Sequence, residues 1–202
     1  MTMKPTKTTP LAAILLGLAA CSSEQTAGST DVEPLLDDLS PAAGSTATAK
    51  FIAPDGEFLG NVTMSDSANG VLIRVDLKGL SRGWHGIHLH QIGDCSDGAD
   101  GFKASGGHIN PDGNAHGLLN PDGYERADMP NIYAGADGRA TAAFFNSYVR
   151  LNNSDDIADT VGYGAVLLDT NGFAMVVHQN PDDHMTQPIG GAGPRIACAA
   201  FN

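Results

Sequence analysis

Short runs in which apolar and polar residues alternate dominate the chain after residue 47, and this period of two is typical of half-buried β-strands. Turn-forming pairs such as Asn69-Gly70 and Asn171-Gly172 separate the runs. The pattern predicts an all-β fold, an eight-stranded antiparallel Greek-key sandwich or flattened barrel. The predicted strands span residues 48–53, 57–64, 71–77, 87–91, 139–146, 165–169, 174–178 and 195–201.

Two long intervals, 93–133 and 179–194, lack this alternation and are rich in Gly, Pro, Asn and Asp. Long ordered loops in a compact domain are usually functional, so we expect these two to carry a metal site. Within the first loop the sequence Asn-Pro-Asp-Gly occurs at 110–113 and again at 120–123. Turn chemistry explains both copies, and a calcium site is the alternative.

The first residues have a different character. Lys4 and Lys7 precede an uncharged run that ends in Leu18-Ala19-Ala20-Cys21, a run too short to span a bilayer. The ending resembles the bacterial lipoprotein box, so residues 1–20 are predicted to be a lipoprotein signal peptide and Cys21 to be acylated. An ordinary signal peptide is the alternative. Residues 21–47 are interpreted as a flexible tether, and 48–202 as the folded domain.

The net charge of −12, with no basic cluster beyond the N-terminus, argues against nucleic acid as a partner. The chain has 3 cysteines, an odd number for an exported protein. Assigning Cys21 to lipid leaves Cys95 and Cys198, which an oxidising compartment would join. Two free thiols are the alternative.

His88 and His90 lie two positions apart in the predicted strand 87–91, so their side chains project from the same face. Imidazole nitrogen is a ligand for copper, zinc, iron or nickel, and a same-face pair supplies half of a four-coordinate site. Two solvated histidines on an exposed strand are the alternative for this pair alone.

The remaining histidines occur in a specific order. Steps of eight and then twelve residues separate His108, His116 and Asp128, and six blocks stand out along the chain: 83–95, 106–111, 116–117, 128–130, 176–178 with 182–183, and 193–198. In these blocks and steps the chain resembles the copper/zinc superoxide dismutases of the bacterial exported type, over about residues 48–202.

This resemblance implies a ligand set. It implies that copper is bound by His88, His90, His108 and His178. It implies that His108 bridges to zinc, whose other ligands include His116 and Asp128. Asp182 would hydrogen-bond His88 and His116 behind the metals, and His85 would brace the backbone. Cys95 and Cys198 would form the family disulfide.

The implied function is conversion of superoxide to oxygen and hydrogen peroxide by alternating Cu(II) and Cu(I). His108 would take a proton when copper is reduced and return it to the peroxide, and Arg195 would dock the superoxide anion. A copper-binding or delivery module without turnover is the alternative. Copper carriers favour Met or Cys ligands, however, and would not need Arg195 or Asp182.

One position departs from the family. Glu125 stands three residues before Asp128, where the family usually has histidine. A carboxylate can bind zinc, so Glu125 is a candidate fourth zinc ligand; the alternative is a three-ligand site with Glu125 turned to solvent and paired with Arg126. We expect the second carboxylate to weaken zinc binding while copper turnover survives. His184 is interpreted as a surface histidine, with an auxiliary copper-entry site as the alternative.

The expected partners are superoxide and a membrane reached through lipid on Cys21. The expected location is the periplasm or the cell surface, and Ser22 after Cys21 favours the outer membrane. A monomer and a homodimer are both compatible with the sequence, because no apolar stripe is clear enough to choose between them.

Overall fold

The computed structural model describes residues 45–152 and 165–202 of this chain. The predicted signal peptide (1–20), Cys21 and nearly all of the tether (21–47) therefore lie outside the described residues. The first strand begins at Thr46, two residues before the predicted start of the domain. Within the described ranges, no helix has the length and apolar character that crossing a lipid bilayer requires.

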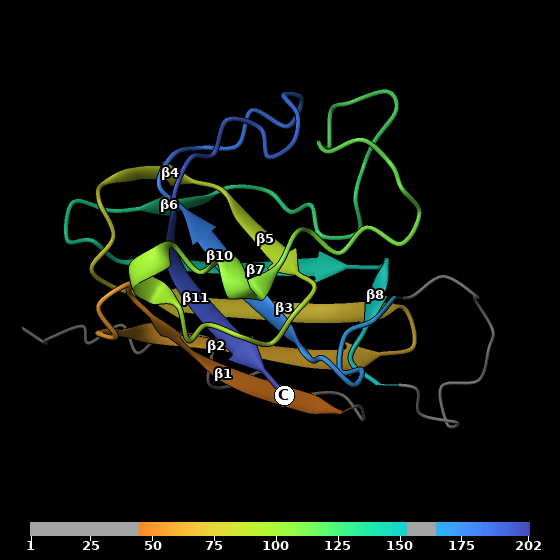
Figure 1. Cartoon of the computed structure of the whole chain (residues 1–202), viewed down its shortest axis with the longest axis horizontal. Helices are drawn as coiled ribbons and strands as arrows, with labels where there is room; N and C mark the ends of the chain where they lie inside the picture. Colours follow the sequence, from red (N-terminus) through yellow and green to blue (C-terminus); the bar gives the residue numbers. More distant parts are fainter. Residues whose placement is uncertain (1–44, 153–164) are drawn as a thin grey trace, which may run out of the picture. The chain divides into compact units, whose positions relative to one another are not determined.

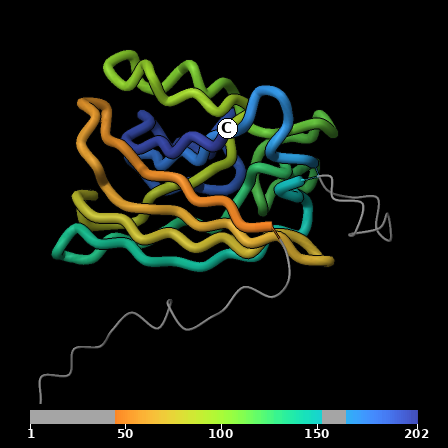
Figure 2. The backbone as a smooth tube through the Cα atoms, turned by 90° about the horizontal axis from the view of Figure 1, so that it is seen from below, coloured from red at the N-terminus to blue at the C-terminus, as the bar shows by residue number. Residues whose placement is uncertain are grey.

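Seven strands form one antiparallel sheet in the spatial order β5-β10-β11-β1-β2-β3-β7 (Figure 1). The sheet curls so that β10 and β11 lie across the core from β2, β3 and β7 (Figure 2). The strands are β1 (Thr46–Ile52), β2 (Phe58–Ser67), β3 (Gly70–Leu77), β5 (Ile87–His90), β7 (Ala140–Asn146), β10 (Phe173–His178) and β11 (Arg195–Phe201). The predicted all-β antiparallel fold is confirmed.

Four shorter strands lie outside this sheet. β4 (Gly83–His85) pairs antiparallel with β6 (Ile132–Ala134), and β8 (Val149–Arg150) pairs parallel with β9 (Ala165–Val166). The sixth predicted strand, 165–169, was therefore wrong as an antiparallel sheet member, because only two of its residues pair, and they pair parallel with β8. Elements of two or three residues are too short to show a period, which is why β4, β6 and β8 were not predicted.

β5 and β10 are anchored in the core by one face and carry the histidines on the other. All residues of both strands are buried, so both faces of each strand are covered. Ile87 and Leu89 of β5 pack into the main apolar core, as do Met175 and Val177 of β10. The alternate side chains project from the opposite face, toward the two long loops. His88, His90 and His178 are among them.

A smaller apolar cluster ties the first long loop to the sheet. Cys95 and Cys198 form a disulfide, so the alternative of two free thiols is excluded. Phe102 and Val176 pack against this disulfide and are fully buried. Phe102 stands between two short 3-10 turns of the loop, η1 (Gly98–Asp100) and η2 (Lys103–Ser105). The loop segment that precedes His108 is thereby fixed against β10 and β11.

Candidate metal centre

Three of the predicted ligands come directly from the sheet. His88 pairs with Val176 across β5 and β10, and the backbone N–H of His178 donates to the Gly86 carbonyl at 2.8 Å. The ring centroids of His88 and His178 lie 5.0 Å apart. Strand alternation therefore brings together histidines that are 90 residues apart in the sequence, because antiparallel neighbours share a face.

The first long loop supplies the fourth histidine by pairing with the free edge of β5. His90 forms an isolated antiparallel bridge with His108, and His88 forms one with Asp128. The Ile109 N–H donates to the Leu89 carbonyl at 3.1 Å, which continues this pairing. The loop thus behaves as a short extra strand, and the pairing register decides which loop side chains meet those of β5.

Each of the four predicted copper ligands has one ring nitrogen occupied. His90 Nδ1 and His178 Nδ1 lie 2.9 Å from the carbonyl oxygens of Gly106 and Gly193. His88 Nε2 lies 2.8 Å from Asp182 Oδ2, and His108 Nδ1 lies 2.5 Å from a Glu125 oxygen. The other nitrogens are buried without a hydrogen-bond partner among the described residues: His88 Nδ1, His90 Nε2, His108 Nε2 and His178 Nε2.

A buried ring nitrogen without a hydrogen bond destabilises the fold unless another group binds it. Four such nitrogens in one place are therefore candidate metal ligands. One ring nitrogen each of His88, His108 and His178 lies within 4.8 Å of the other two. His90 stands just outside this group, with its ring centroid 5.1 Å from that of His108. In His88, His90 and His178 the outer acceptor fixes the tautomer, because the nitrogen that faces it carries the proton and the other nitrogen is left to bind a metal.

The copper-side histidines are held neutral by burial. Burial lowers the pKa of His88 to about 4 and that of His178 to about 3. Burial also holds the pKa of His90 well below its usual value. An imidazole must be unprotonated to bind a metal, so desolvation prepares these three side chains as ligands.

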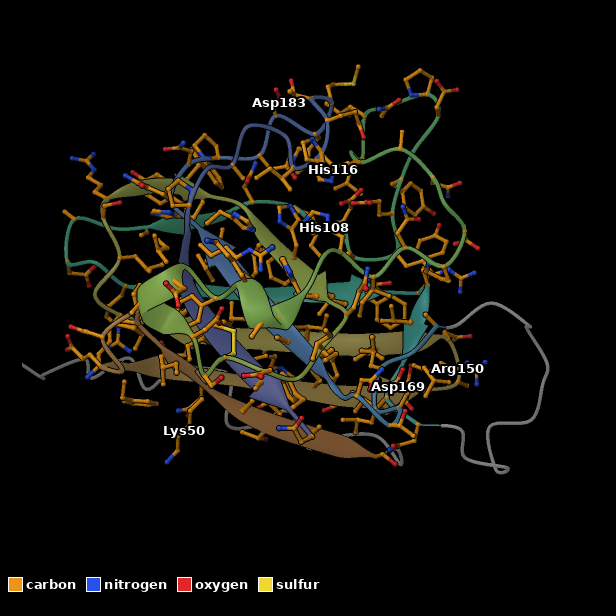
Figure 3. All side chains as sticks on the ribbon, in the orientation of Figure 1. Lys50, His108, His116, Arg150, Asp169 and Asp183 are labelled. Atoms are coloured by element: carbon orange, nitrogen blue, oxygen red, sulfur yellow. A yellow bond between two sulfur atoms is a disulfide. The ribbon has the colours of Figure 1, made fainter. Side chains whose placement is uncertain are left out.

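The second cluster lies on the other side of the His108 ring and contains carboxylates. Figure 3 shows His108 and His116 in the region between the sheet and the loop that carries Asp183. Glu125 Oε2 lies 2.5 Å from His108 Nδ1 and 3.2 Å from His116 Nδ1. Asp128 Oδ1 lies 2.8 Å from His116 Nδ1 and 3.8 Å from His108 Nδ1. These atoms converge on one point, since all lie within 4.8 Å of one another.

Glu125 is not turned to solvent, so that alternative is wrong. Its side chain is 11% exposed and faces both histidines. Arg126 pairs instead with Asp112, its Nε and Nη2 lying 2.6 and 2.8 Å from the two carboxylate oxygens. The Glu125 N–H donates to Asp128 Oδ2 at 3.0 Å, and this bond holds the Glu125 backbone beside the carboxylate cluster.

In the cluster that contains the carboxylates, the pKa shifts favour charged side chains, whereas those of the copper-side histidines favour neutral ones. Burial alone would lower the pKa of His116, but hydrogen bonds to Asp128, Asp182 and Glu125 raise it to about 11. Burial alone would raise the pKa of Glu125, but contacts with His108 and His116 lower it to about 2. The carboxylates therefore stabilise positive charge at the place where a divalent cation would sit.

Asp182 connects the two clusters from behind. Its oxygens accept hydrogen bonds from His88 Nε2 at 2.8 Å and from His116 Nε2 at 3.2 Å. Burial alone would raise the pKa of Asp182, but these two histidines hold it well below its usual range. Gly190, at φ +59°, permits this placement, because a Cβ there would overlap the Asp182 carboxylate. One buried anion thus orients one ring of each cluster.

Arg195 is held next to the copper side. Its Nη1 donates to the Phe102 carbonyl at 2.6 Å and to Ser105 Oγ at 2.9 Å, and its Nη2 donates to the Gly106 carbonyl at 2.8 Å. The same Gly106 oxygen accepts from His90, so the guanidinium and a copper-side ring share one acceptor. The position of the charge is therefore set by the loop that also carries His108.

Two histidines lie outside both clusters. His85 Nδ1 lies 2.8 Å from the His178 carbonyl and its Nε2 lies 2.8 Å from the Ser81 carbonyl, so its ring contacts backbone carbonyls, one of them that of a copper-side histidine. His184 is not a surface residue as predicted: its side chain is 16% exposed and its Nδ1 lies 3.3 Å from Asp182 Oδ2. The backbone N–H of His184 also donates to Asp182, which draws the residue inward.

Sequence reasoning missed the residues that hold the ligands from outside. The backbone carbonyls of Gly106 and Gly193 carry no sequence signal, because any residue has one. Gln187 also escaped notice: its amide accepts from the His116 N–H at 3.0 Å and donates to the His116 carbonyl at 2.8 Å. Asn110 was interpreted only as a turn residue, although it contacts Glu125.

The donor sets fit two different metals. Four imidazole nitrogens suit copper, and two imidazoles with two carboxylates suit zinc. Tetrahedral zinc with bonds of about 2.0–2.1 Å separates its ligand atoms by about 3.3 Å, and the four separations given above range from 2.5 to 3.8 Å on either side of that value. Fold and site therefore define a metalloprotein of the antiparallel β class with two adjoining metal sites.

Comparison with known proteins agrees with this class. A family model described as copper/zinc superoxide dismutase (SODC) matches residues 58–201. A Caulobacter vibrioides protein named superoxide dismutase (Cu-Zn) is 48% identical over 157 residues, which cover 77% of this chain and 85% of the relative. Superoxide dismutase (Cu-Zn) 2 of Aquifex aeolicus is 37% identical, with the same coverage. The chain belongs to the copper/zinc superoxide dismutase family, and is thus an oxidoreductase with copper and zinc as its metals.

Solved structures show the same fold. The crystal structure of a superoxide dismutase-like protein from Bacillus subtilis gives a TM-score of 0.70 at 27% identity and covers 78% of this chain and 100% of that chain. Cu/Zn superoxide dismutase from Brucella abortus gives a TM-score of 0.58 at 26% identity, with the same coverage.

Proposed function

We propose that this chain disproportionates superoxide to oxygen and hydrogen peroxide, with His88, His90, His108 and His178 holding copper. When bound, copper supplies the one-electron exchange by which one superoxide is oxidised and another is reduced. The observation that carries the proposal is that each of these four rings has a buried nitrogen without a hydrogen-bond partner among the described residues, while an outer contact fixes the other nitrogen of His88, His90 and His178. Family membership supports the activity.

We propose that zinc is held by His108, His116, Asp128 and Glu125. The support is the convergence of two ring nitrogens and two carboxylate oxygens within 4.8 Å. With two carboxylates the ligands carry two negative charges, which balance the charge of Zn²⁺. His108 contributes its Nδ1 to this side and its Nε2 to the copper side, so zinc would hold the ring in place while Nε2 takes up and returns a proton.

Arg195 is proposed to bind the superoxide anion. Its guanidinium is permanently charged, and three contacts with the first long loop fix its direction. It lies beside His90, with which it shares the Gly106 carbonyl. A fixed positive charge there orients a small anion without any titration of the side chain at working pH.

An activity assay on the copper- and zinc-loaded protein tests this function. We expect superoxide consumption well above that of the same amount of free copper. Arg195→Ile should bind copper stoichiometrically but lose most of the activity, because it removes the charge that binds the anion and leaves all four proposed copper ligands in the chain. A copper-delivery module would bind copper and show no turnover in either form, which would contradict the proposal.

Export and anchoring rest on the sequence of the first residues alone. We propose that residues 1–20 are removed and that lipid on Cys21 holds the domain at a membrane facing the periplasm or the cell surface, with the outer membrane favoured. Incorporation of labelled fatty acid into the native chain but not into Cys21→Ala tests the anchor, and fractionation tests the location. Whether the domain is a monomer or a homodimer is tested by sedimentation.

A further inference from the structure

Asn110 lies two residues after His108, the proposed bridging ligand. The Asn110 Nδ2 donates to Glu125 Oε1 at 3.0 Å and to the Asn114 carbonyl at 2.8 Å. Its Oδ1 accepts from the Asn114 N–H at 3.0 Å. The flipped amide would place an oxygen against both Glu125 and the Asn114 carbonyl, so the network allows one orientation only. Asn110 therefore presents a fixed donor to Glu125.

This contact divides the two oxygens of Glu125. Oε1 is occupied by Asn110, whereas Oε2 lies 2.5 Å from His108 Nδ1 and 3.2 Å from His116 Nδ1. The geometry at Asp128 is equivalent: Oδ2 accepts from the Gly117 and Glu125 N–H groups at 2.8 and 3.0 Å, and Oδ1 faces the histidines. Each carboxylate thus offers one oxygen to the metal point and has the other held away.

A neighbouring ion pair keeps the Asn110 turn in place. Arg126, next to Glu125, makes a two-point contact with Asp112, two residues after Asn110. The pair is partly exposed, so its own contribution to stability is small. It nevertheless forms a second connection between the 110–113 turn and the segment that carries Glu125. The placement of Asn110 against Glu125 therefore does not depend on one hydrogen bond alone.

We propose that Asn110 is a positioning residue that makes Glu125 a single-oxygen zinc ligand. This inference rests on the proposed zinc ligation by Glu125. Without the Asn110 donor, Oε1 has no other hydrogen-bond partner among the described residues, and the carboxylate can rotate toward two-oxygen binding or away from the metal. A two-histidine, two-carboxylate site needs one oxygen from each acid to stay four-coordinate, so the role of Asn110 follows from the replacement of histidine by Glu125.

Zinc affinity of the full chain, measured by competition with a chromophoric chelator, tests the proposal. We expect Asn110→Ser and Asn110→Asp each to raise the zinc dissociation constant about 10- to 100-fold, the usual cost of removing an outer hydrogen bond to a ligand. Both variants keep an oxygen for the Asn114 N–H, so the turn is preserved. Asn69→Asp, in the exposed β2–β3 hairpin, adds the same charge as Asn110→Asp and should leave zinc affinity unchanged.

A double-mutant cycle with Glu125→Ala separates positioning from general loop damage. In the Glu125→Ala background, Asn110→Ser should have no further effect on zinc affinity, because there is no carboxylate left to hold. An equal loss in both backgrounds, or no loss in the native background, overturns the role of Asn110. If Glu125→Ala itself leaves zinc affinity unchanged, the proposed ligation by Glu125 fails first, and the two failures are thus distinguished.

Discussion

The two metal clusters share the His108 ring but achieve their chemistry by opposite means. On the copper side, none of the described residues offers a hydrogen-bonding partner to the inward nitrogens of His88 and His178, and burial lowers the pKa of both histidines and leaves unprotonated ligands. On the zinc side, Glu125 and Asp128 face the rings, and the pKa of His116 rises to about 11. The difference teaches that desolvation selects neutral ligands for a redox metal, whereas buried carboxylates require a cation.

The two sides are nevertheless coupled through Asp182. Its two oxygens contact His88 on one side and His116 on the other. A change on the zinc side can therefore reach the copper side through this carboxylate as well as through His108.

The largest expected effect is loss of a copper-side ring. His178→Gln should lower dismutase activity and copper affinity, because it removes a direct ligand. The decrease should exceed the roughly 10- to 100-fold loss that follows removal of a hydrogen-bond partner behind a ligand. Zinc content should be nearly unchanged. Metal analysis and activity after copper loading measure both effects. His184→Gln, a histidine outside the clusters, should retain copper and serves as the control; equal copper loss in the two variants would contradict the assignment.

The next effect should reach both sides at once. Asp182→Asn keeps the shape of the side chain but offers only one acceptor oxygen, so one of the two ring N–H groups loses its partner. We expect about 10- to 100-fold weaker zinc binding and a smaller decrease in copper affinity, since His88 keeps its place in β5. Titration of each metal into the metal-free protein measures this. A loss confined to one metal would show that Asp182 does not couple the clusters.

Glu125→His replaces one carboxylate of the zinc side by the histidine that the family resemblance implies at this position. We expect the native protein to hold zinc about tenfold less tightly than this variant, a difference of about 1.4 kcal/mol, with copper-dependent turnover preserved in both. Chelator competition measures zinc retention. Equal retention in native protein and variant would show that the second carboxylate does not weaken the site.

The smallest effect is a pH dependence of the metal-free protein in which the two sides have opposite signs. His178, with a folded pKa of about 3 against a usual 6.5, binds its proton only when unfolded between these values, so stability should fall as pH decreases through that range. His116, with a folded pKa of about 11, contributes stability below pH 6.5 that is lost as pH rises toward 11.

Urea unfolding of chelator-treated protein over a pH series measures this dependence. His178→Gln should flatten only the acid side of the stability profile, and His116→Gln only the alkaline side. If either variant changes both sides equally, the opposite charge preferences of the clusters are not the cause.

The strands that form the sheet were predictable because alternation reports burial directly, and seven of the predicted segments pair in the sheet. The short strands β4, β6 and β8 were not, because two or three residues carry no period. The placement of His184 was also missed: its own backbone N–H is drawn to Asp182, a contact set by loop conformation rather than by residue type.

The sequence by itself determined which side chains could bind metal, since the parity of His88 and His90 and the order of the later histidines are properties of the chain. Only the tertiary structure decided which nitrogen or oxygen of each residue faces inward. That choice depends on acceptors and donors distant along the chain, such as the Gly193 carbonyl for His178 and the Asn110 amide for Glu125. Hydrogen bonds of this kind form only after the loops have folded against the sheet, so no local pattern records them.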